Sequence, residues 1–338
     1  MGRIVTLLPL SLSMALALAL ALALALAPAP GLALPQLSVD YYKNSCPQVE
    51  NIIQAEMKQK LSVNPTTAGG TLRIFFHDCF VEGCDGSVLI SSTPENKAEK
   101  DADINLSLPG DGFDAVVRAK TAVEAQCPGI VSCADVLSIA TRDLITLVGG
   151  PHYPVKKGRK DGLISEASRV GGNLPLATMN VDVLTALFHS KGLTRADMIT
   201  LSGGHTIGFT HCKEFMQRIY SYNKTNHVDP TMNFQYAMEL RKACPQKNLD
   251  PSIVAFIDVN SPTKFDNGFY RNLHQGLGLL ASDQVLYSDP RTRGAVQLYA
   301  SNQTAFFKAF AAAMDKLGSV GVKTGTQGEI RNRCDAFN

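Results

Sequence analysis

Eight cysteines behind an apolar N-terminal segment place the tightest limit on how this chain of 338 residues can fold. Residues 1–35 contain an early charge, Arg3, and then a mainly apolar run over residues 4–29. Small residues follow, with Gly31 and Ala33 at suitable −3 and −1 cleavage positions. We interpret this segment as a secretory signal peptide. A run this long could also remain as a membrane anchor. Cleavage is favoured because small and proline-rich residues follow it, and no charged stop-transfer cluster does.

An even number of cysteines after such a segment predicts four disulfide bonds, formed in an oxidising compartment. Many pairings are possible for eight cysteines, and the sequence alone does not choose among them. A metal site is the weaker alternative, because no C-x2-C pair occurs; zinc ribbons and the C-x-x-C-H attachment of c-type haem are both excluded. Sequons at Asn105, Asn223 and Asn302 agree with secretion. The cysteines are Cys46, Cys79, Cys84, Cys127, Cys133, Cys212, Cys244 and Cys334.

Composition and periodicity indicate one mostly helical globular protein. Hydrophobic residues make up 45% of the chain and charged residues 18%. The net charge of +2 leaves no electrostatic footprint for nucleic acid, and no polybasic run indicates membrane lipid. Strand-like alternation is scarce, so we expect an all-α class with very little β and one domain over residues 36–338. Helical apolar spacing occurs within 49–57, 133–147, 184–188, 198–205 and 307–317, with stops at Gly149, Gly192 and Gly318, and long irregular connections are expected at 150–178 and 221–236.

Two histidines stand in unusual surroundings. Arg73 and His77 are four residues apart in the apolar run LRIFFHDCF, so they share one helix face and offer a fixed cation and a general base. His205 follows Gly203 and Gly204, and each glycine costs a helix about 1 kcal/mol relative to alanine. A flat, bulky group approaching the backbone would explain both glycines, although a single such histidine could equally be a core residue. The remaining histidines lack this context, and we expect surface or structural places for them: His152, His189, His211, His227 and His274.

Oxygen ligands follow His77 at short intervals and suit a hard cation such as Ca²⁺. The spacing is not that of an EF-hand, and Cys79 and Cys84 flank the segment as a possible staple. A solvated acidic turn is the alternative interpretation. A second, weaker set occurs late in the chain, where ordinary turn chemistry would also explain it. The first set is Asp78, Val81, Gly83, Asp85 and Ser87, and the second is Asp258, Ser261, Lys264 and Asp266.

Four segments resemble the signatures of secretory plant haem peroxidases (class III): LRIFFHDCFVEGCDGSVLI, SGGHTIGFTHC, KFDNGFYRNL and ASDQVLYSDP. YYKNSCPQVENII and IRNRCDAFN near the two ends match as well, so the resemblance covers residues 36–338. It implies a two-lobed fold, with one non-covalent haem b between a distal and a proximal lobe. It also implies an enzyme of the apoplast or cell wall that reduces H2O2 to water and oxidises phenolic donors in one-electron steps. Lignin and suberin formation, wall cross-linking, oxidative stress response and H2O2 removal are the roles implied.

The resemblance assigns a role to each residue of the suspected site. His205 is implied to be the axial ligand of the haem iron, with Asp283 accepting from its other ring nitrogen. His77 is implied to be the distal base and Arg73 the distal cation. Asn105 would accept a hydrogen bond from His77 and would therefore carry no glycan, which leaves Asn223 and Asn302 for modification. Further implied are a hydrogen-bond chain extended by Glu99, a pocket wall at Phe76 and a substrate contact at Pro175.

Two calcium sites and a disulfide pattern complete what the resemblance implies. The distal site would use the first oxygen set. The proximal site would use the second set together with Thr206, and Lys264 would contribute only its carbonyl. A monomer without nucleic-acid or membrane partners is expected. The implied disulfides are Cys46–Cys127, Cys79–Cys84, Cys133–Cys334 and Cys212–Cys244.

Two other functions are less consistent with the residues. A wall-binding protein of the same fold without turnover would have lost His77, Arg73 or His205, and all three are present. A secreted Ser-His-Asp hydrolase would need a nucleophile elbow, and no G-x-S-x-G occurs. A visible haem absorption band would separate the peroxidase from both alternatives.

Overall fold

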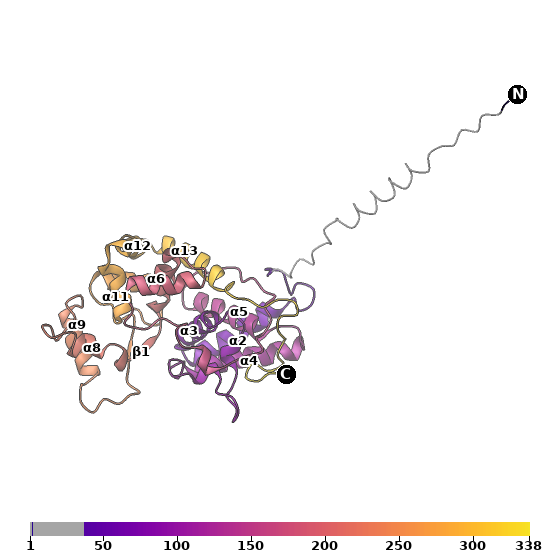
Figure 1. Ribbon diagram of the computed structural model, residues 1–338, viewed down its shortest axis with the longest axis horizontal. Helices are drawn as coiled ribbons and strands as arrows, with labels where there is room; N and C mark the ends of the chain where they lie inside the picture. The colour runs from indigo at the N-terminus through magenta and orange to yellow at the C-terminus, as the bar shows by residue number, and fades with distance from the viewer. Residues whose placement is uncertain (1, 3–36) are drawn as a thin grey trace. The chain divides into compact units, whose positions relative to one another are not determined.

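The computed structural model describes Gly2 and residues 37–338. The predicted signal peptide at residues 1–35 lies outside the described part, apart from Gly2. Residues 37–338 form one compact unit (Figure 1). Within the described residues, no helix combines the length and the apolar character needed to cross a membrane.

The unit is mostly helical, as the apolar spacing predicted. The strands described in it are β1 (Phe209–His211) and β2 (Val254–Phe256), which pair antiparallel with Phe209 opposite Phe256. Short 3₁₀ turns join several of the helices. The α-helices are α2 (Val49–Val63), α3 (Thr67–Phe80), α4 (Gly110–Gln126), α5 (Cys133–Leu147), α6 (Val181–Ser190), α7 (Arg195–Ser202), α8 (Met216–Tyr220), α9 (Phe234–Ala243), α10 (Gly268–His274), α11 (Ala281–Ser288), α12 (Pro290–Ser301) and α13 (Gln303–Leu317).

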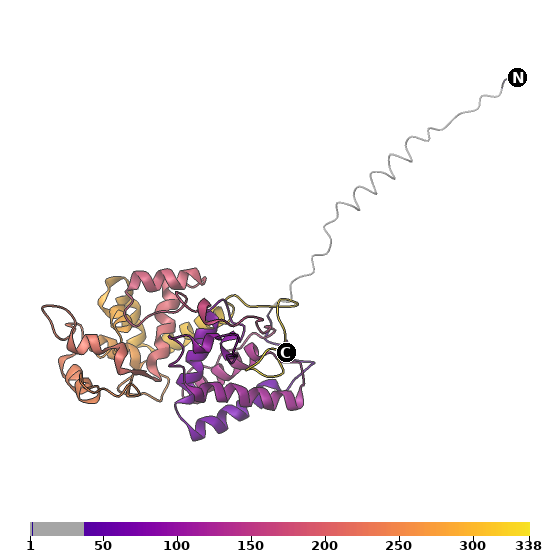
Figure 2. The same ribbon diagram turned by 60° about the horizontal axis from the view of Figure 1, so that its bottom comes forward.

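Helices α2 to α5 form one lobe, in which α5 is the buried central helix (Figures 1 and 2). Helix α5 packs against α2, α3 and α4. Its residues 133–145 are all buried, which is expected of a helix that is covered on every side. The side chain of Ser132 caps the first turn by accepting a hydrogen bond from the amide of Asp135. Gly149, at φ 101°, follows the last turn, so the predicted stop is confirmed.

Helices α6 to α13 form the other lobe (Figure 2). Helix α13 packs on α7 and α12, and α10 packs on α11 and α12. Aromatic side chains fill the space between these helices, with the Phe306 ring 5.0 Å from Tyr270 and 5.6 Å from Phe310. Helices α8 and α9 have a small core of their own around the buried Phe215. The irregular connections predicted at 150–178 and 221–236 contain no α-helix, except that α9 already begins at Phe234.

The segment before His205 corrects two details of the sequence interpretation. Helix α7 ends at Ser202, and His205 lies in the following 3₁₀ helix η4 (Gly203–Thr206). A Cβ on Gly203 would collide with Tyr270 and Phe306, so close helix packing requires this glycine, and a flat ligand does not. Gly204 does line a large cavity. Only one of the two glycines therefore fits the reason first given for the pair.

All eight cysteines are paired, and the pairs are those that the resemblance implied. Cys133–Cys334 ties the C-terminal segment to the start of α5, across 201 residues of chain. Cys212–Cys244 joins the segment after β1 to the end of α9. The remaining two bonds, Cys46–Cys127 and Cys79–Cys84, lie within the first lobe.

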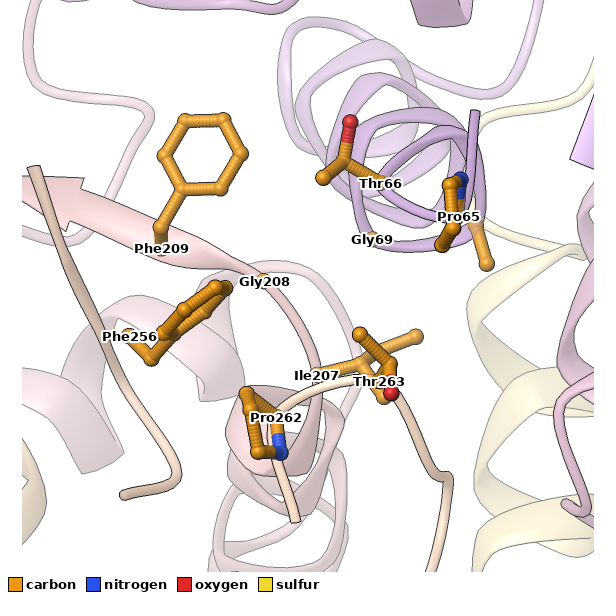
Figure 3. A pocket seen from close by; sticks show the side chains of 10 residues that line it. Pro65, Thr66, Gly69, Ile207, Gly208, Phe209, Phe256, Pro262 and Thr263 are labelled. Carbon is orange, nitrogen blue, oxygen red and sulfur yellow. The ribbon is translucent and has the colours of Figure 1, made fainter. Parts of the chain in front are cut away.

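A small pocket lies where α3 meets the strands (Figure 3). Gly69 of α3 approaches the backbone of Gly208 so closely that a Cβ on Gly69 would lie 3.0 Å from the Gly208 Cα. Phe209 and Phe256 lie at the other side of this pocket. Its volume is about 10 Å³, and its lining contains no titratable side chain. The absence of a side chain on Gly69 and on Gly208 lets α3 pack directly against the segment that follows His205.

Candidate active site

A cavity of about 270 Å³ collects the candidate catalytic residues from both lobes. Helix α3 supplies one part of the lining, η4 another, and residues of α6, α11 and α13 contribute further side chains. Apolar side chains provide most of the wall, as is usual for a cofactor pocket. The structure therefore brings together residues that are far apart in the chain: Arg73, Phe76, His77, Pro175, His205 and Asp283.

Arg73 and His77 both reach the cavity from one face of α3. The guanidinium of Arg73 donates to the carbonyl of Ser107 at 2.8 Å and to its hydroxyl at 2.9 Å. Both contacts fix the arginine side chain on the cavity wall. Burial lowers the pKa of Arg73, and the carboxylate of Glu214 opposes that shift. The group still stays charged at any physiological pH.

The amide of Asn105 fixes the tautomer of His77. Its Oδ1 lies 2.7 Å from His77 Nδ1, and its Nδ2 donates to the carbonyl of Glu99 at 2.8 Å. Because the amide oxygen can only accept, Nδ1 carries the proton and Nε2 keeps its lone pair. Burial, together with the charge of Arg73, lowers the pKa of His77 to about 3. His77 is therefore a neutral base over the ordinary pH range.

Glu99 extends the hydrogen-bond chain from His77, as the resemblance implied, but it does so through its main chain. Asn105 meets the backbone carbonyl of Glu99, and the carboxylate instead accepts from the hydroxyl of Ser87 at 3.1 Å. The hydrogen-bond chain from His77 thus continues through main chain. The carboxylate of Glu99, through Ser87, contacts the oxygen-rich loop that follows α3. Asn105 and Glu99 therefore link His77 to the oxygen-rich loop through hydrogen bonds.

The electrostatic surroundings of His205 are opposite to those of His77, because a carboxylate lies beside His205 and a guanidinium lies near His77. Its Nδ1 donates to Asp283 Oδ1 at 2.9 Å, and the carboxylate is almost fully buried. Burial lowers the pKa of His205, but Asp283 outweighs it, so that the pKa is raised. The imidazole is 42% exposed, and this area faces the cavity that it lines. No partner for Nε2 occurs among the residues that the structure describes, which leaves this nitrogen available as a ligand atom.

Comparison with known proteins places this geometry in a family. The family model described as Peroxidase matches residues 49–302. The chain belongs to the peroxidase family. Peroxidase 41 of Arabidopsis thaliana is 55% identical over 304 residues, which cover 90% of this chain and 92% of that protein. Peroxidase 51 of the same plant is 53% identical and covers 91% of this chain and 94% of its own length. Peroxidase 65 is also 53% identical, with 89% of both chains covered.

Membership of this family makes the chain a plant secretory haem peroxidase, an oxidoreductase that acts on H2O2. The cavity fits the haem that the family uses. It is large and mainly apolar, and it contains an imidazole whose free nitrogen is made more basic by a buried carboxylate. Asp283 Oδ2 has no hydrogen-bond partner among the described residues, so no second hydrogen bond at that oxygen weakens the pull of the carboxylate on His205.

The oxygen set after α3 gathers three buried carboxylates, those of Asp78, Asp85 and Glu99. Asp78 accepts from the amide of Gly86 at 2.9 Å. Burial and mutual repulsion raise the pKa of Asp78 and of Glu99. Lys323 contacts the carboxylate of Asp85 and compensates part of this charge. The donor set is suited to Ca²⁺, with the carbonyls of Val81 and Gly83 and the hydroxyl of Ser87 available alongside.

The second oxygen set also converges, around Asp258. The hydroxyl of Thr206 lies 3.2 Å from Asp258 Oδ2, and the hydroxyl of Ser261 lies 3.3 Å from carboxylate oxygens of both Asp258 and Asp266. The single hydroxyl proton of Ser261 can be donated to only one of these two carboxylates at a time. The side chain of Lys264 is 67% exposed, which leaves its carbonyl as the candidate ligand.

Each oxygen set needs backbone or hydroxyl ligands to hold a cation. In the described part of the chain, no three His, Cys, Asp or Glu side chains converge closely enough to bind a metal alone. Carbonyl and hydroxyl oxygens are ordinary calcium ligands, so this finding agrees with hard-cation chemistry.

Sequence reasoning missed four residues near these sites. His211, Lys213 and Glu214 line the cavity, although His211 was expected to have only a local packing role. The segment SGGHTIGFTHC contained His211, but no spacing rule connected it to His77. Lys323 reaches Asp85 across 238 residues of sequence. A contact over that distance leaves no local pattern, so only the folded chain reveals it.

Proposed function

We propose that the cavity binds one non-covalent haem b, with Nε2 of His205 as the axial ligand of its iron. The observation that carries this proposal is the contrast between two histidines in one cavity. An amide carbonyl orients His77, whose pKa is lowered, and a carboxylate orients His205, whose pKa is raised. His77 is thereby a neutral base, and His205 is suited to be a strong metal ligand. Since all eight cysteines form disulfides, none remains for a covalent haem link.

The side chains of α3 would perform the proton chemistry of peroxide cleavage. When bound, the haem would supply the redox chemistry, by giving two electrons to the peroxide and recovering them from donors one at a time. His77 Nε2 takes a proton from one oxygen of H2O2 and delivers it to the other, which leaves as water. Arg73 stabilises the negative charge that develops while the O–O bond breaks. Overall, one H2O2 and two phenols give two waters and two phenoxyl radicals.

Phenolic donors would reach the cavity beside Pro175, which lines it and fits the proposed substrate contact. Phe76 walls the interior and stacks on Phe80, with the ring centroids 4.0 Å apart. Purified holoenzyme should show a haem absorption band and should oxidise simple phenols only when H2O2 is present. A panel of phenols that all fail, in a preparation with full haem content, would contradict the proposed donor class.

We propose Ca²⁺ at both oxygen sets. The distal set would consist of Asp78, Val81, Gly83, Asp85 and Ser87. The proximal set would consist of Thr206, Asp258, Ser261, Lys264 and Asp266. Asp78 follows His77 directly and Thr206 follows His205 directly, so each cation would stabilise the backbone that carries one of the two histidines.

We also propose that residues 36–338 act as one exported catalytic domain and as a monomer. Four disulfides support an oxidising compartment. Asn223 and Asn302 are exposed sequons, as expected of sites that receive N-glycans in the secretory pathway. The apoplast or cell wall is the location that fits these features.

Glycan mapping gives a test of the role of Asn105. We expect the sequons at Asn223 and Asn302 to be modified and Asn105 to be unmodified. Asn105 is 1% exposed, and its Nδ2, the atom to which a glycan would be attached, donates to the carbonyl of Glu99. The measurement is glycopeptide mass spectrometry of active enzyme from a plant host. An intact glycopeptide at Asn105 would mean that this residue does not orient His77.

A further inference from the structure

Glu214 is a cavity residue that the proton chemistry leaves without a role. Three acidic side chains line the cavity. Asp283 is buried and paired with His205. Asp103 is 97% exposed and lies 3.6 Å from Lys97, so water surrounds its charge. The side chain of Glu214 is 41% exposed, less than that of Asp103 and more than that of Asp283, which places a partly screened negative charge on the cavity wall.

The backbone of Glu214 is firmly anchored. Glu214 ends the 3₁₀ helix η5 (Cys212–Glu214), whose first residue forms the disulfide with Cys244. The amide of Cys212 donates to the carbonyl of Ile253 at 3.2 Å, and Phe215, the next residue, is fully buried. These contacts hold the main chain on both sides of Glu214 against its neighbours. Its side-chain torsions are the main freedom that it keeps.

The charge of Glu214 acts on the interior of the cavity. It opposes the effect of burial on the pKa of Arg73, so the carboxylate lies within electrostatic reach of that guanidinium. Nζ of Lys213 lies 3.7 Å from Oε1 of Glu214. The Lys213 side chain is 68% exposed, however, so water screens its ammonium charge more strongly than it screens the carboxylate. Of this neighbouring pair, the carboxylate is thus the charge that a molecule inside the cavity experiences more strongly.

We propose that Glu214 selects electron donors by charge, favouring phenols that carry an ammonium group and disfavouring phenols that carry a carboxylate. A like charge near a binding site lowers affinity for the wrong ligand, and an opposite charge raises it for the right one. This inference rests on the proposed function, because it requires that donors are oxidised at this cavity. It adds a selection by the charge of the donor, which Pro175 and the apolar wall cannot provide.

Three phenols that differ only in the end of a short side chain provide the test: tyramine, 4-ethylphenol and 3-(4-hydroxyphenyl)propionate. The kcat/KM of each is measured with the calcium-loaded holoenzyme near pH 6.5, where the amine is protonated and the acid is ionised. In Glu214→Gln, the ratio of kcat/KM for tyramine to that for the propionate should fall roughly three- to tenfold. The neutral 4-ethylphenol should change less than about twofold, and added salt should reduce the difference between the enzymes.

Two variants serve as controls. Asp103→Asn removes an equal charge from a solvated position on the same lining and should leave the ratio unchanged. Lys213→Gln should raise the preference for tyramine by a smaller factor. Dissociation constants of the three phenols for the resting enzyme, measured without peroxide, should follow the same order as kcat/KM.

An unchanged ratio in Glu214→Gln would overturn the proposal. So would an equal change for all three donors, since that would indicate a structural role without charge selection. If the wild-type enzyme with full haem content fails to oxidise even 4-ethylphenol, the proposed donor class fails, and that result is distinct from a failure of charge selection.

Discussion

Replacement of His77 by alanine should slow the reaction with H2O2 by roughly 10²–10⁴-fold, the usual contribution of a positioned acid–base group. The variant lacks the nitrogen that takes the peroxide proton, and no other base is held in that place by Asn105. Haem content should stay normal, because His205 and Asp283 are unchanged. The measurement is the second-order rate constant for H2O2 from stopped-flow absorbance, with haem content determined on the same preparation.

His189 offers a matched control for this variant. It is exposed on α6 and does not line the cavity, so His189→Ala should react with H2O2 at the wild-type rate. Asn105→Ala should give an intermediate loss, since the base remains but its tautomer is no longer fixed. A near-normal rate for His77→Ala with full haem content would show that His77 is not the base.

Removal of calcium should have the second large effect, on stability. A ligand present at 1,000 times its Kd stabilises the folded state by about 4.1 kcal/mol. In a domain of this size, losing that amount lowers Tm by on the order of 10 °C. Chelation should therefore lower Tm and alter the haem spectrum, and added Ca²⁺ should restore both. Mg²⁺ should restore them poorly, because it requires a smaller octahedral site.

Single substitutions separate the two calcium sites. Asp258→Asn should lower the bound calcium from two ions to one, as counted by elemental analysis, because its carboxylate is the centre of the proximal set. Lys264→Ala should retain both ions, since only its backbone carbonyl is proposed as a ligand. Unchanged Tm, activity and haem spectrum after chelation would contradict the stabilising role of calcium.

The sequence predicted much of the site because several of its relationships are local. Arg73 and His77 share a helix face through their spacing alone, and Asp78 and Thr206 adjoin the two histidines in the chain. Helix positions followed from apolar spacing and glycine stops, with the difference that His205 lies in η4 beyond the end of α7. At this helix end Gly203 packs against Tyr270 and Phe306, a contact that no local pattern reports.

By itself, then, the sequence determined the mostly helical class and the family, and it predicted the residues for which we propose chemical roles. Only the tertiary structure decided that α3, η4 and η5 share one cavity, that Asn105 meets Glu99 through main chain, and that Lys323 reaches Asp85. The same packing placed Glu214 on the cavity wall. The reason is physical: residue spacing determines which side chains share a helix face, whereas contacts between distant segments depend on how helices and disulfides pack. The charge that a donor meets is a property of that packing.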